Sequence, residues 1–525
     1  MRHVLLLAMV TCWLPGADLV QEGDRWWSHI QVLAADNMEG RNTGSPGHLR
    51  AARFLAGKFK EAGLQPLGTN GYLQPVKFKV AKILEDQSSL AIVRDGKATP
   101  LTLGLDANLG VRAKMPEHTE ADVVFCGYGL SIPENHFDDF AGLDLTGKLI
   151  VYILGGPADI PANLRSHYSF RSERWKAMHA AGAIGVVAIQ NPKSMDIPWE
   201  RSTLARLNAA MELGDEKFSG TPGLQFAAVI NPARAEQFFA ASGHTFAELL
   251  ALADQGQALP RFPLNLRLRA TARLQTSTVE SQNVVGLLPG SDPTLKNQYV
   301  VYGAHLDHLG VGAAITGDAI YNGAMDDGSG IASLIEIATM ARLEHLRPKR
   351  SILFVAVTGE EKGLLGSQFF TSAPTVPLRN MVADINMDMY LPLYPLKYLE
   401  VQGLEESTLG LDIRAVAEKA GVIVQRDREP QRNLFIRSDQ YSYIKQGVPA
   451  LTFKFGAEAG SAEEKLGKDW LRQRYHAPSD DLSQPVDKPA AAKFNRIMLD
   501  LGMRVANAAE RPHWNADSFF KRFEH

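Results

Sequence analysis

Hydrophobic residues follow two different periodic patterns along this chain. Near the beginning, Trp27, Ile30 and Leu33 recur at helical spacing, and a second helix is predicted after Gly47. From about Ser281 onward, short apolar runs alternate with helical segments. Strands are predicted at 283–288, 299–304, 351–358, 381–387 and 450–455, with a helix at 328–342. This alternation is typical of an α/β fold with a mixed, mostly parallel central sheet flanked by helices.

The middle of the chain has the pattern of a smaller α/β unit. Strands are predicted at 121–126, 148–154, 184–189 and 227–230, and helices at 171–181 and 233–241. A chain of 525 residues is long enough for two to four domains. We therefore predict an N-terminal part of the main domain over 18–110, an inserted unit over 111–275 and the rest of the main domain over 276–525.

The first residues have the composition of a secretory signal peptide. Arg2 precedes an apolar stretch, 4–14, and small residues follow it, so residues 1–17 are predicted to direct export to the periplasm or the medium. An uncleaved apolar anchor and a misassigned start are the alternatives, and the residues before Cys12 match a lipidation site poorly. After cleavage only Cys126 remains, which excludes an internal disulfide and predicts a buried, inert thiol. We expect no stable membrane insertion.

Overall charge excludes one class of partner. The chain has a formal net charge of −3, 45% hydrophobic and 22% charged residues, and no run of Lys and Arg. Nucleic-acid binding needs a concentrated basic surface, so we do not expect a nucleic-acid partner.

Side chains that bind metals follow one another in the second half of the chain, several of them at the ends of predicted strands. Two imidazoles and three carboxylates are too few to hold two divalent cations separately, but they suffice if one carboxylate bridges both ions. Open coordination positions then remain for water. A further acid, Glu360, is placed to accept a proton from that water. The candidate ligands are His305, Asp326, Glu361, Asp388 and His476.

The first two motifs add supporting groups. His305 leaves a buried strand, and Asp307 is predicted to accept a hydrogen bond from its second ring nitrogen, which would fix the tautomer. Either Asp326 or Asp327 could instead cap the helix that follows. We assign the bridging role to Asp326 and a supporting or capping role to Asp327.

The remaining motifs can also be explained by local structure alone, without a metal site. Glu360 and Glu361 could form the acidic first turn of a helix, although the surrounding glycines weaken that reading. We assign Glu361 as a ligand and Glu360 as the base. Asp388 ends an apolar strand, where a carboxylate is costly unless paired or metal-bound. A loop histidine such as His476 is more often simply exposed.

Taken together, the series GAHLDHLG (303–310), YNGAMDDGSG (321–330), TGEEKGLLGS (358–367), NMDM (386–389) and YHAPSDD (475–481) resembles the co-catalytic zinc exopeptidases of the secreted aminopeptidase and glutamate-carboxypeptidase family. The resemblance covers roughly 280–510. It implies a mixed α/β sheet flanked by helices, two zinc ions, and removal of single residues from peptide ends. It also implies His305 and Asp388 on one zinc, Glu361 and His476 on the other, Asp326 between them, and Glu360 as general base.

The inserted unit resembles the protease-associated domain often found in this family. The resemblance is carried by VFCGYG (124–129), DDFAG (138–142), GKLIVY (147–152) and AAGAIG (180–185). Family members usually have Ser-Asp-His-Tyr-Pro-Phe where this chain has SDQYSY (438–443). Asp439 is kept, whereas Gln440 cannot titrate and Ser442 replaces a rigid proline. We expect this departure to bear on substrate choice or pH response.

These observations predict metal-assisted peptide hydrolysis, with peptides as substrates and aminopeptidase action favoured. Carboxypeptidase action stays open, because Arg432 and Arg437 could bind a terminal carboxylate. Two further alternatives are a receptor-like relative without catalysis and a single-zinc acyltransferase of the glutaminyl-cyclase type.

Overall fold

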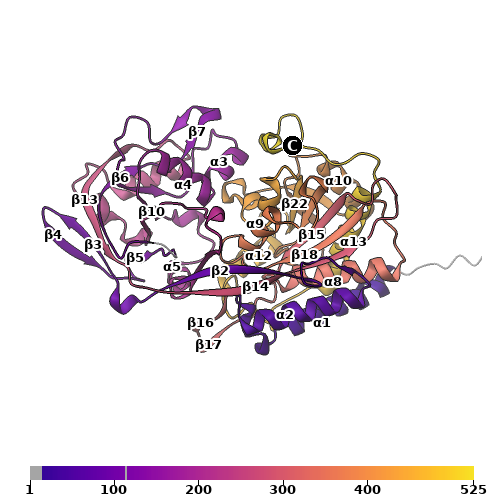
Figure 1. The fold of residues 1–525 in the computed structure, drawn as a ribbon. Helices are drawn as coiled ribbons and strands as arrows, with labels where there is room; N and C mark the ends of the chain where they lie inside the picture. The colour runs from indigo at the N-terminus through magenta and orange to yellow at the C-terminus, as the bar shows by residue number, and fades with distance from the viewer. Residues whose placement is uncertain (1–14, 113–114, 525) are drawn as a thin grey trace, which may run out of the picture.

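A computed structural model describes residues 15–112 and 115–524 of the chain. Residues 1–14 of the predicted signal peptide therefore lie outside the described part, as does Cys12. Within the described residues, no helix is both long and apolar enough to cross a membrane. The fold is α/β with two mixed sheets, as predicted, and Figure 1 shows the two side by side.

The larger sheet has the strand order β11-β2-β14-β18-β15-β19-β22-β20-β21, with β1 paired to β14. Its centre is parallel, because β18, β15, β19 and β22 run in one direction, and its flanks are largely antiparallel. "Mostly parallel" thus describes the centre of this mixed sheet only. The strands are β1 (Gln65–Pro66), β2 (Leu73–Ile83), β11 (Ala210–Leu213), β14 (Leu274–Leu288), β15 (Tyr299–His305), β18 (Ser351–Val357), β19 (Met381–Asn386), β20 (Tyr398–Gln402), β21 (Ile423–Arg426) and β22 (Ala450–Gly456).

Helices cover both faces of the larger sheet (Figure 1). Alternate strand residues such as Tyr302 and Phe354 pack with α1, α2, α8 and α13 in one core, whereas Val301 and Val355 pack with Phe370 on the other face. The N-terminal helices therefore pack on the main body, as the sequence predicted. The helices are α1 (Pro15–Leu33), α2 (Pro46–Glu61), α8 (Gly328–Leu343), α9 (Leu365–Ser372), α10 (Leu409–Lys419), α11 (Gln440–Ile444), α12 (Ala462–Gln473) and α13 (Lys488–Asn507).

The smaller sheet has eight strands in the order β4-β3-β13-β6-β9-β10-β12-β5, with a parallel centre from β6 to β12. Cys126 ends β6 and is buried, and burial raises the pKa of its thiol. The strands are β3 (Ser89–Arg94), β4 (Lys97–Leu101), β5 (Ala107–Leu109), β6 (His118–Cys126), β9 (Leu149–Ile153), β10 (Gly185–Ile189), β12 (Phe226–Ile230) and β13 (Arg261–Thr271). The main helices are α3 (Ala162–Ser169), α4 (Arg171–Ala180), α5 (Trp199–Ser202), α6 (Glu236–Phe239) and α7 (Phe246–Asp254).

The strand pairing differs from the predicted boundaries of the inserted unit. Three strands that precede residue 111 (β3, β4 and β5) belong to the smaller sheet, and β11, from within 111–275, pairs with β2 of the larger one. The long strands β2 and β14 run between the two parts (Figure 1). The prediction placed these early strands in the main domain; β3 and β4 are short, and β4 is largely exposed, so their weak hydrophobic pattern does not mark the boundary.

Candidate metal centre

The candidate ligands lie at the carboxyl ends of the central parallel strands of the larger sheet. His305 is the last residue of β15, Glu361 follows β18, and Asp388 follows β19. Asp326 lies in the turn before α8, and His476 lies in the loop after α12. Open α/β sheets place their sites at this edge, because the strand ends point into one crevice.

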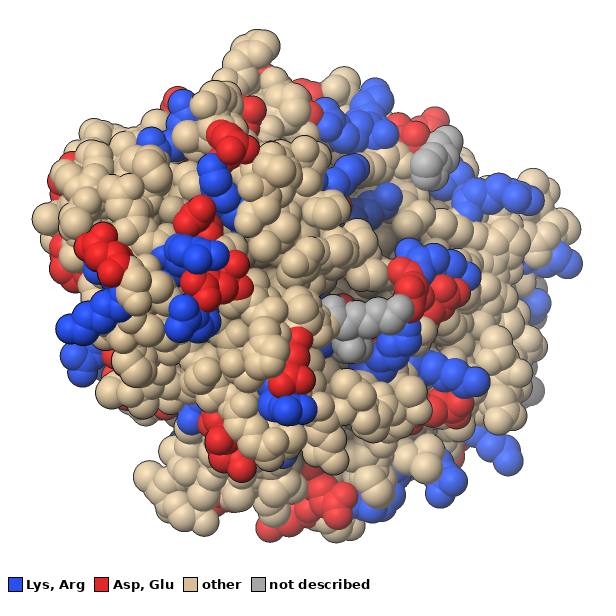
Figure 2. Space-filling model, turned by 60° about the vertical axis from the view of Figure 1, so that its left-hand side comes forward, with Lys and Arg blue, Asp and Glu red and all other residues tan. Residues whose placement is uncertain are grey.

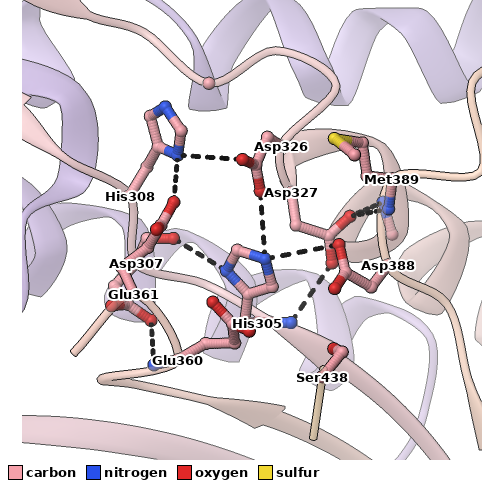
Figure 3. Close-up of polar contacts among 12 residues, drawn as sticks. His305, Asp307, His308, Asp326, Asp327, Glu360, Glu361, Asp388, Met389 and Ser438 are labelled. Carbon is pink, nitrogen blue, oxygen red and sulfur yellow. Dashed lines mark hydrogen bonds and ion pairs between the residues drawn. The ribbon is translucent and has the colours of Figure 1, made fainter. Parts of the chain in front are cut away.

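Distances bring these five side chains into a single cluster, of which Figure 3 shows His305, Asp326, Glu361 and Asp388. His305 Nε2 lies 3.1 Å from Asp326 Oδ1 and 3.5 Å from Asp388 Oδ1. His476 Nε2 lies 3.3 Å from Asp326 Oδ2 and 3.2 Å from Glu361 Oε2. Asp326 therefore offers one oxygen to each of two imidazole–carboxylate pairs, which is the arrangement a bridging carboxylate needs.

The donor set fits divalent metal ions. Ligand atoms of His305, Asp327 and Asp388 lie within 4.8 Å of one another, and so do those of His308, Asp326 and Glu361. Asp326 Oδ2 and Glu361 Oε1 are buried without a hydrogen-bond partner. Imidazole nitrogens combined with carboxylate oxygens suit zinc, and buried oxygens without partners are favourable only when a cation or proton meets them.

Asp307 supports the cluster differently from the prediction. The His305 ring donates from Nδ1 to the backbone carbonyl of Asp307, at 2.9 Å, and not to its carboxylate. This hydrogen bond leaves Nε2 free to face the carboxylates. The Asp307 carboxylate instead accepts from Thr43 Oγ1 at 2.7 Å and from the backbone N–H of Glu360 at 3.1 Å. Asp307 therefore fixes both the histidine and the backbone at Glu360, through different atoms.

Asp327 caps α8. Its Oδ1 accepts hydrogen bonds from the backbone N–H groups of Gly330, at 2.9 Å, and Met389, at 3.2 Å, and its Oδ2 accepts from that of His305, also at 3.2 Å. One carboxylate thus ties together three segments that carry the candidate ligands, and its capping role matches the assignment from sequence.

Two groups that the sequence analysis did not assign hold the loop of Asp326. Asp480 accepts hydrogen bonds from the backbone N–H groups of Met325 and Asp326, at 2.9 and 3.0 Å. The buried guanidinium of Arg41 donates to the carbonyl oxygens of Asn322 and Gly323, at 2.6 and 2.8 Å. Asp480 lies within the quoted motif YHAPSDD, which is a signal for it, whereas Arg41 is 281 and 282 residues away in sequence from the groups it binds.

His308 is the third histidine of the cluster and was not predicted. Its ring is fully buried, with Nδ1 2.8 Å from Glu361 Oε1 and 3.8 Å from Asp326 Oδ2 (Figure 3). Glu361 therefore faces two imidazoles, through Oε1 to His308 and through Oε2 to His476. The signal was its place three residues after His305 in the same motif.

Charge is concentrated in this cluster, and it shifts several pKa values. Burial, reinforced by neighbouring Glu361 and Asp388, raises the pKa of Glu360 well above its usual range. Although burial opposes it, the His308 charge and hydrogen bonds from the other two histidines hold the pKa of Asp326 well below its usual range. Burial opposes the charged form of His476 too, but the Glu361 and Asp326 carboxylates raise its pKa to about 10. Negative charge at the cluster thus favours cations.

The unusual SDQYSY segment lies beneath the cluster. Gln440 is fully buried, where it accepts a hydrogen bond from Asn386 Nδ2 at 2.9 Å and donates to the carbonyl of Phe435 at 3.0 Å. Ser442 shares a hydrogen bond of 2.9 Å with Ser367. Burial raises the pKa of the neighbouring Asp439 to about 7. Gln440 and Ser442 therefore form hydrogen bonds with the residues packed below the strand ends.

A pocket of about 1060 Å³ opens above the cluster, between the two parts of the molecule. Glu360, Glu361 and His476 line it from one side, and residues of the smaller sheet line it from the other. Arg432 and Arg437, the predicted carboxylate-binding pair, are bound by Asp196 at 2.6 and 2.9 Å. On the face shown in Figure 2, the described basic and acidic side chains are interspersed.

The cluster lies at the carboxyl edge of the parallel strands of an α/β sheet, and its imidazole and carboxylate donors suit zinc. Residues 283–502 match the family model described as Peptidase family M28. The match coincides with the strands and loops that carry the candidate ligands.

Curated relatives match over part of their length. The chain is 38% identical over 112 residues to a "Probable zinc metalloprotease" of Pyrenophora teres f. teres, covering 21% of this chain and 23% of that protein. It is 28% identical over 250 residues to "Probable leucine aminopeptidase 2" of Aspergillus fumigatus, covering 45% and 46%. The chain thus spans less than half the length of these relatives.

Solved structures share the fold over nearly the whole chain. "Aminopeptidase from Aneurinibacillus sp. strain AM-1" aligns with a TM-score of 0.55 at 18% identity, covering 94% of this chain and 97% of that one. A "Peptidase M28 precursor" from Shewanella amazonensis SB2B aligns with a TM-score of 0.50 at 17% identity, covering 95% and 98%. Both sheets therefore belong to an arrangement that other chains adopt.

Proposed function

We propose that this protein is a zinc-dependent exopeptidase that acts as an aminopeptidase. The observation that carries the proposal is Asp326, which offers one oxygen to each of two imidazole–carboxylate pairs beside a buried glutamate in a pocket. Similarity to proteins named leucine aminopeptidase and to a solved aminopeptidase supports the same conclusion.

In this proposal His305 and Asp388 hold one zinc, Glu361 and His476 hold the second, and Asp326 lies between them. When bound, two such ions polarise a carbonyl oxygen and make water a stronger acid. His308 Nδ1 lies 2.8 Å from Glu361 Oε1 and would orient that carboxylate, leaving Oε2 available as a ligand atom.

Glu360 is the proposed general base. It lies directly before Glu361, lines the pocket, and has a pKa raised well above its usual range by burial. It accepts the proton of the attacking water and returns it to the leaving amine. Asp307 holds its backbone N–H and positions it for both transfers. The free amine of the substrate lies near the carboxylate cluster, whose negative charge favours an ammonium group.

Carboxypeptidase action on the same centre is the second candidate. The basic residues of the pocket favour it, since a terminal carboxylate needs cationic partners. It differs from the first candidate in which end of the peptide must be free, so blocked peptides separate the two.

The test combines metal removal with a substrate panel. Chelation should abolish hydrolysis, and elemental analysis of the restored protein should find two zinc ions per chain. Free dipeptides and aminoacyl anilides should be hydrolysed, and N-acetyl dipeptides should not. Full activity in verified metal-free protein would contradict the proposal. Cleavage of N-blocked peptides alone would indicate a carboxypeptidase. Cyclisation of N-terminal glutamine with a single bound zinc would indicate a glutaminyl-cyclase-type acyltransferase, and metal binding without turnover of any substrate would indicate a receptor-like protein.

A further inference from the structure

A second group of buried polar side chains lies beneath the strand ends, between β19 and α11. Asp384 and Asn386 belong to β19 and project to the same side of that strand, because they are two residues apart. Asp439 precedes α11 and Tyr443 lies within it, and α11 contacts β19. Each of these four side chains is at most 1% exposed. None of them has a part in the function proposed above.

These four side chains contain oxygen atoms without hydrogen-bond partners. Both carboxylate oxygens of Asp384 and of Asp439 lack a partner, as do Asn386 Oδ1 and the hydroxyl of Tyr443. Over residues 15–112 and 115–524, no Lys, Arg or His side chain lies within ion-pair distance of either carboxylate. Buried carboxylates are costly unless a proton, a hydrogen-bond donor or a cation meets them.

Gly303 leaves space beside two of these oxygens. It pairs with Asn386 across β15 and β19. A Cβ placed on Gly303 would lie 2.8 Å from Asn386 Oδ1 and 3.3 Å from Asp384 Oδ1, so both oxygens point at the same position. The orientation of the Asn386 amide is fixed, because its Nδ2 donates to Gln440 Oε1 at 2.9 Å and to Ser438 Oγ at 3.1 Å.

The second carboxylate belongs to the same group, as its electrostatic effect shows. Burial, followed by the Asp439 charge, raises the pKa of Asp384 well above its usual range. Burial, followed by the charges of both carboxylates, raises the pKa of Tyr443 in the same way. Burial also raises the pKa of Asp439 to about 7, although the His305 charge and the nearby Ser367 hydroxyl oppose it. Two carboxylates in such an environment repel each other unless positive charge lies between them.

A shared proton would satisfy only part of this group. Its six unpartnered atoms are all oxygens, and the Tyr443 hydroxyl holds the one hydrogen among them when both acids are ionised. Acceptors therefore outnumber donors even after one acid is protonated. Calcium is bound by about six to eight oxygens from carboxylates and amide carbonyls, whereas magnesium usually keeps several waters and zinc favours nitrogen and sulfur.

We propose a calcium site beneath the candidate zinc centre, formed by Asp384, Asn386, Asp439 and Tyr443. Two carboxylates balance the two charges of the ion, and the amide and phenol oxygens complete an all-oxygen donor set. The ion would hold β19 to α11 and so stabilise the floor of the metal centre. This site does not depend on the reaction that the zinc centre performs.

The test uses zinc-saturated native protein, expressed and purified with calcium present. Elemental analysis after gel filtration should find one calcium ion per chain in addition to zinc. The same protein, stripped with a chelator and reloaded with zinc alone, should gain about 3 °C or more in melting temperature when calcium is added to saturation. Magnesium and sodium at equal ionic strength should give a much smaller shift. An equal shift with either of them, or no calcium and no shift, overturns the inference.

The variant Asp384→Asn removes one carboxylate and nearly keeps the side-chain shape. It should lose both the calcium and the calcium-dependent shift, and it should keep its zinc. The matched control is Asp139→Asn, since Asp139 is also buried but its Oδ2 accepts hydrogen bonds from the backbone of Tyr128 and Leu130. This control should keep the calcium. Calcium that stays bound to Asp384→Asn overturns the inference, and if that variant does not fold, the measurements on native protein decide alone.

Discussion

The two large sheets of this molecule both have a parallel centre, and the carboxyl ends of both border one pocket, but the residues at those ends differ in kind. The larger sheet ends in His305 at β15, and Glu360 and Glu361 follow β18. The smaller sheet reaches the pocket with Gly155, after β9, and Asn191, after β10. The same position in a parallel sheet therefore carries candidate metal ligands and a candidate base in one part, and pocket-lining residues in the other.

The substitution Glu360→Gln should have the largest effect on activity and therefore tests this difference most directly. Without a base, kcat should fall by about 10²- to 10⁴-fold, as expected for loss of a general acid–base group. Bound zinc, measured by elemental analysis, should stay at the native level, because Glu360 is not a proposed ligand.

A matched change on the opposite wall is Asp254→Asn, which also neutralises an acid that lines the pocket. It should leave kcat within a few-fold of the native value. A comparable loss in the two variants would show that the chemistry is not confined to the larger sheet.

His308 provides the next test, since it belongs to the larger sheet's cluster without being a proposed ligand. Removing it in His308→Ala should weaken zinc affinity about 10- to 100-fold, the usual cost of losing a group that orients a ligand. Asparagine can donate from nearly the same position as Nδ1, so His308→Asn should recover much of the affinity. Competition with a chromophoric chelator measures both. If the two variants lose zinc equally, His308 is itself a ligand.

The residues that cluster in the candidate metal centre could be predicted from the sequence more completely than the residues that hold them in place, for a physical reason. A histidine or an acid that ends a buried strand has few neutral explanations, so His305 and Asp388 stood out. The atom of Asp307 that binds His305 was misassigned, because a carbonyl and a carboxylate of one residue look the same in sequence. Arg41 attracted no attention, because the carbonyl oxygens that it binds belong to residues 281 and 282 positions away in the sequence.

The two parts also contain buried ionisable groups whose contributions to folding stability change with pH in opposite directions. Asp139, in the smaller part, is buried, and burial raises the pKa of its carboxyl to about 7 despite hydrogen bonds from the backbone of Leu130 and Tyr128. The folded state keeps a proton that the unfolded chain releases near its ordinary value of 3.8. The contribution of Asp139 to the unfolding free energy is therefore complete below pH 3.8 and is lost as the pH rises toward 7.

We expect Asp139→Asn to remove this dependence. Between pH 5 and pH 7 the native protein should lose about 2 kcal/mol of unfolding free energy more than the variant, as the two pKa values imply. Urea unfolding of both proteins at the two pH values measures the difference. Equal losses in both proteins would mean that Asp139 stays ionised in the folded state.

His48, in the larger part, responds in the other direction. Its ring is fully buried next to Ser281, at 3.1 Å, and burial followed by the Arg41 charge lowers its pKa to about 3. The unfolded chain binds a proton near pH 6.5, but the folded state does not until pH 3. The stability that His48 contributes is therefore complete above pH 6.5 and falls as the solution is acidified.

Between pH 7 and pH 5 the native protein should lose about 2 kcal/mol more unfolding free energy than the His48→Gln variant, in the same urea experiment. If the variant loses as much as the native protein, the ring is already protonated when folded, and the opposite responses of the two parts would not hold.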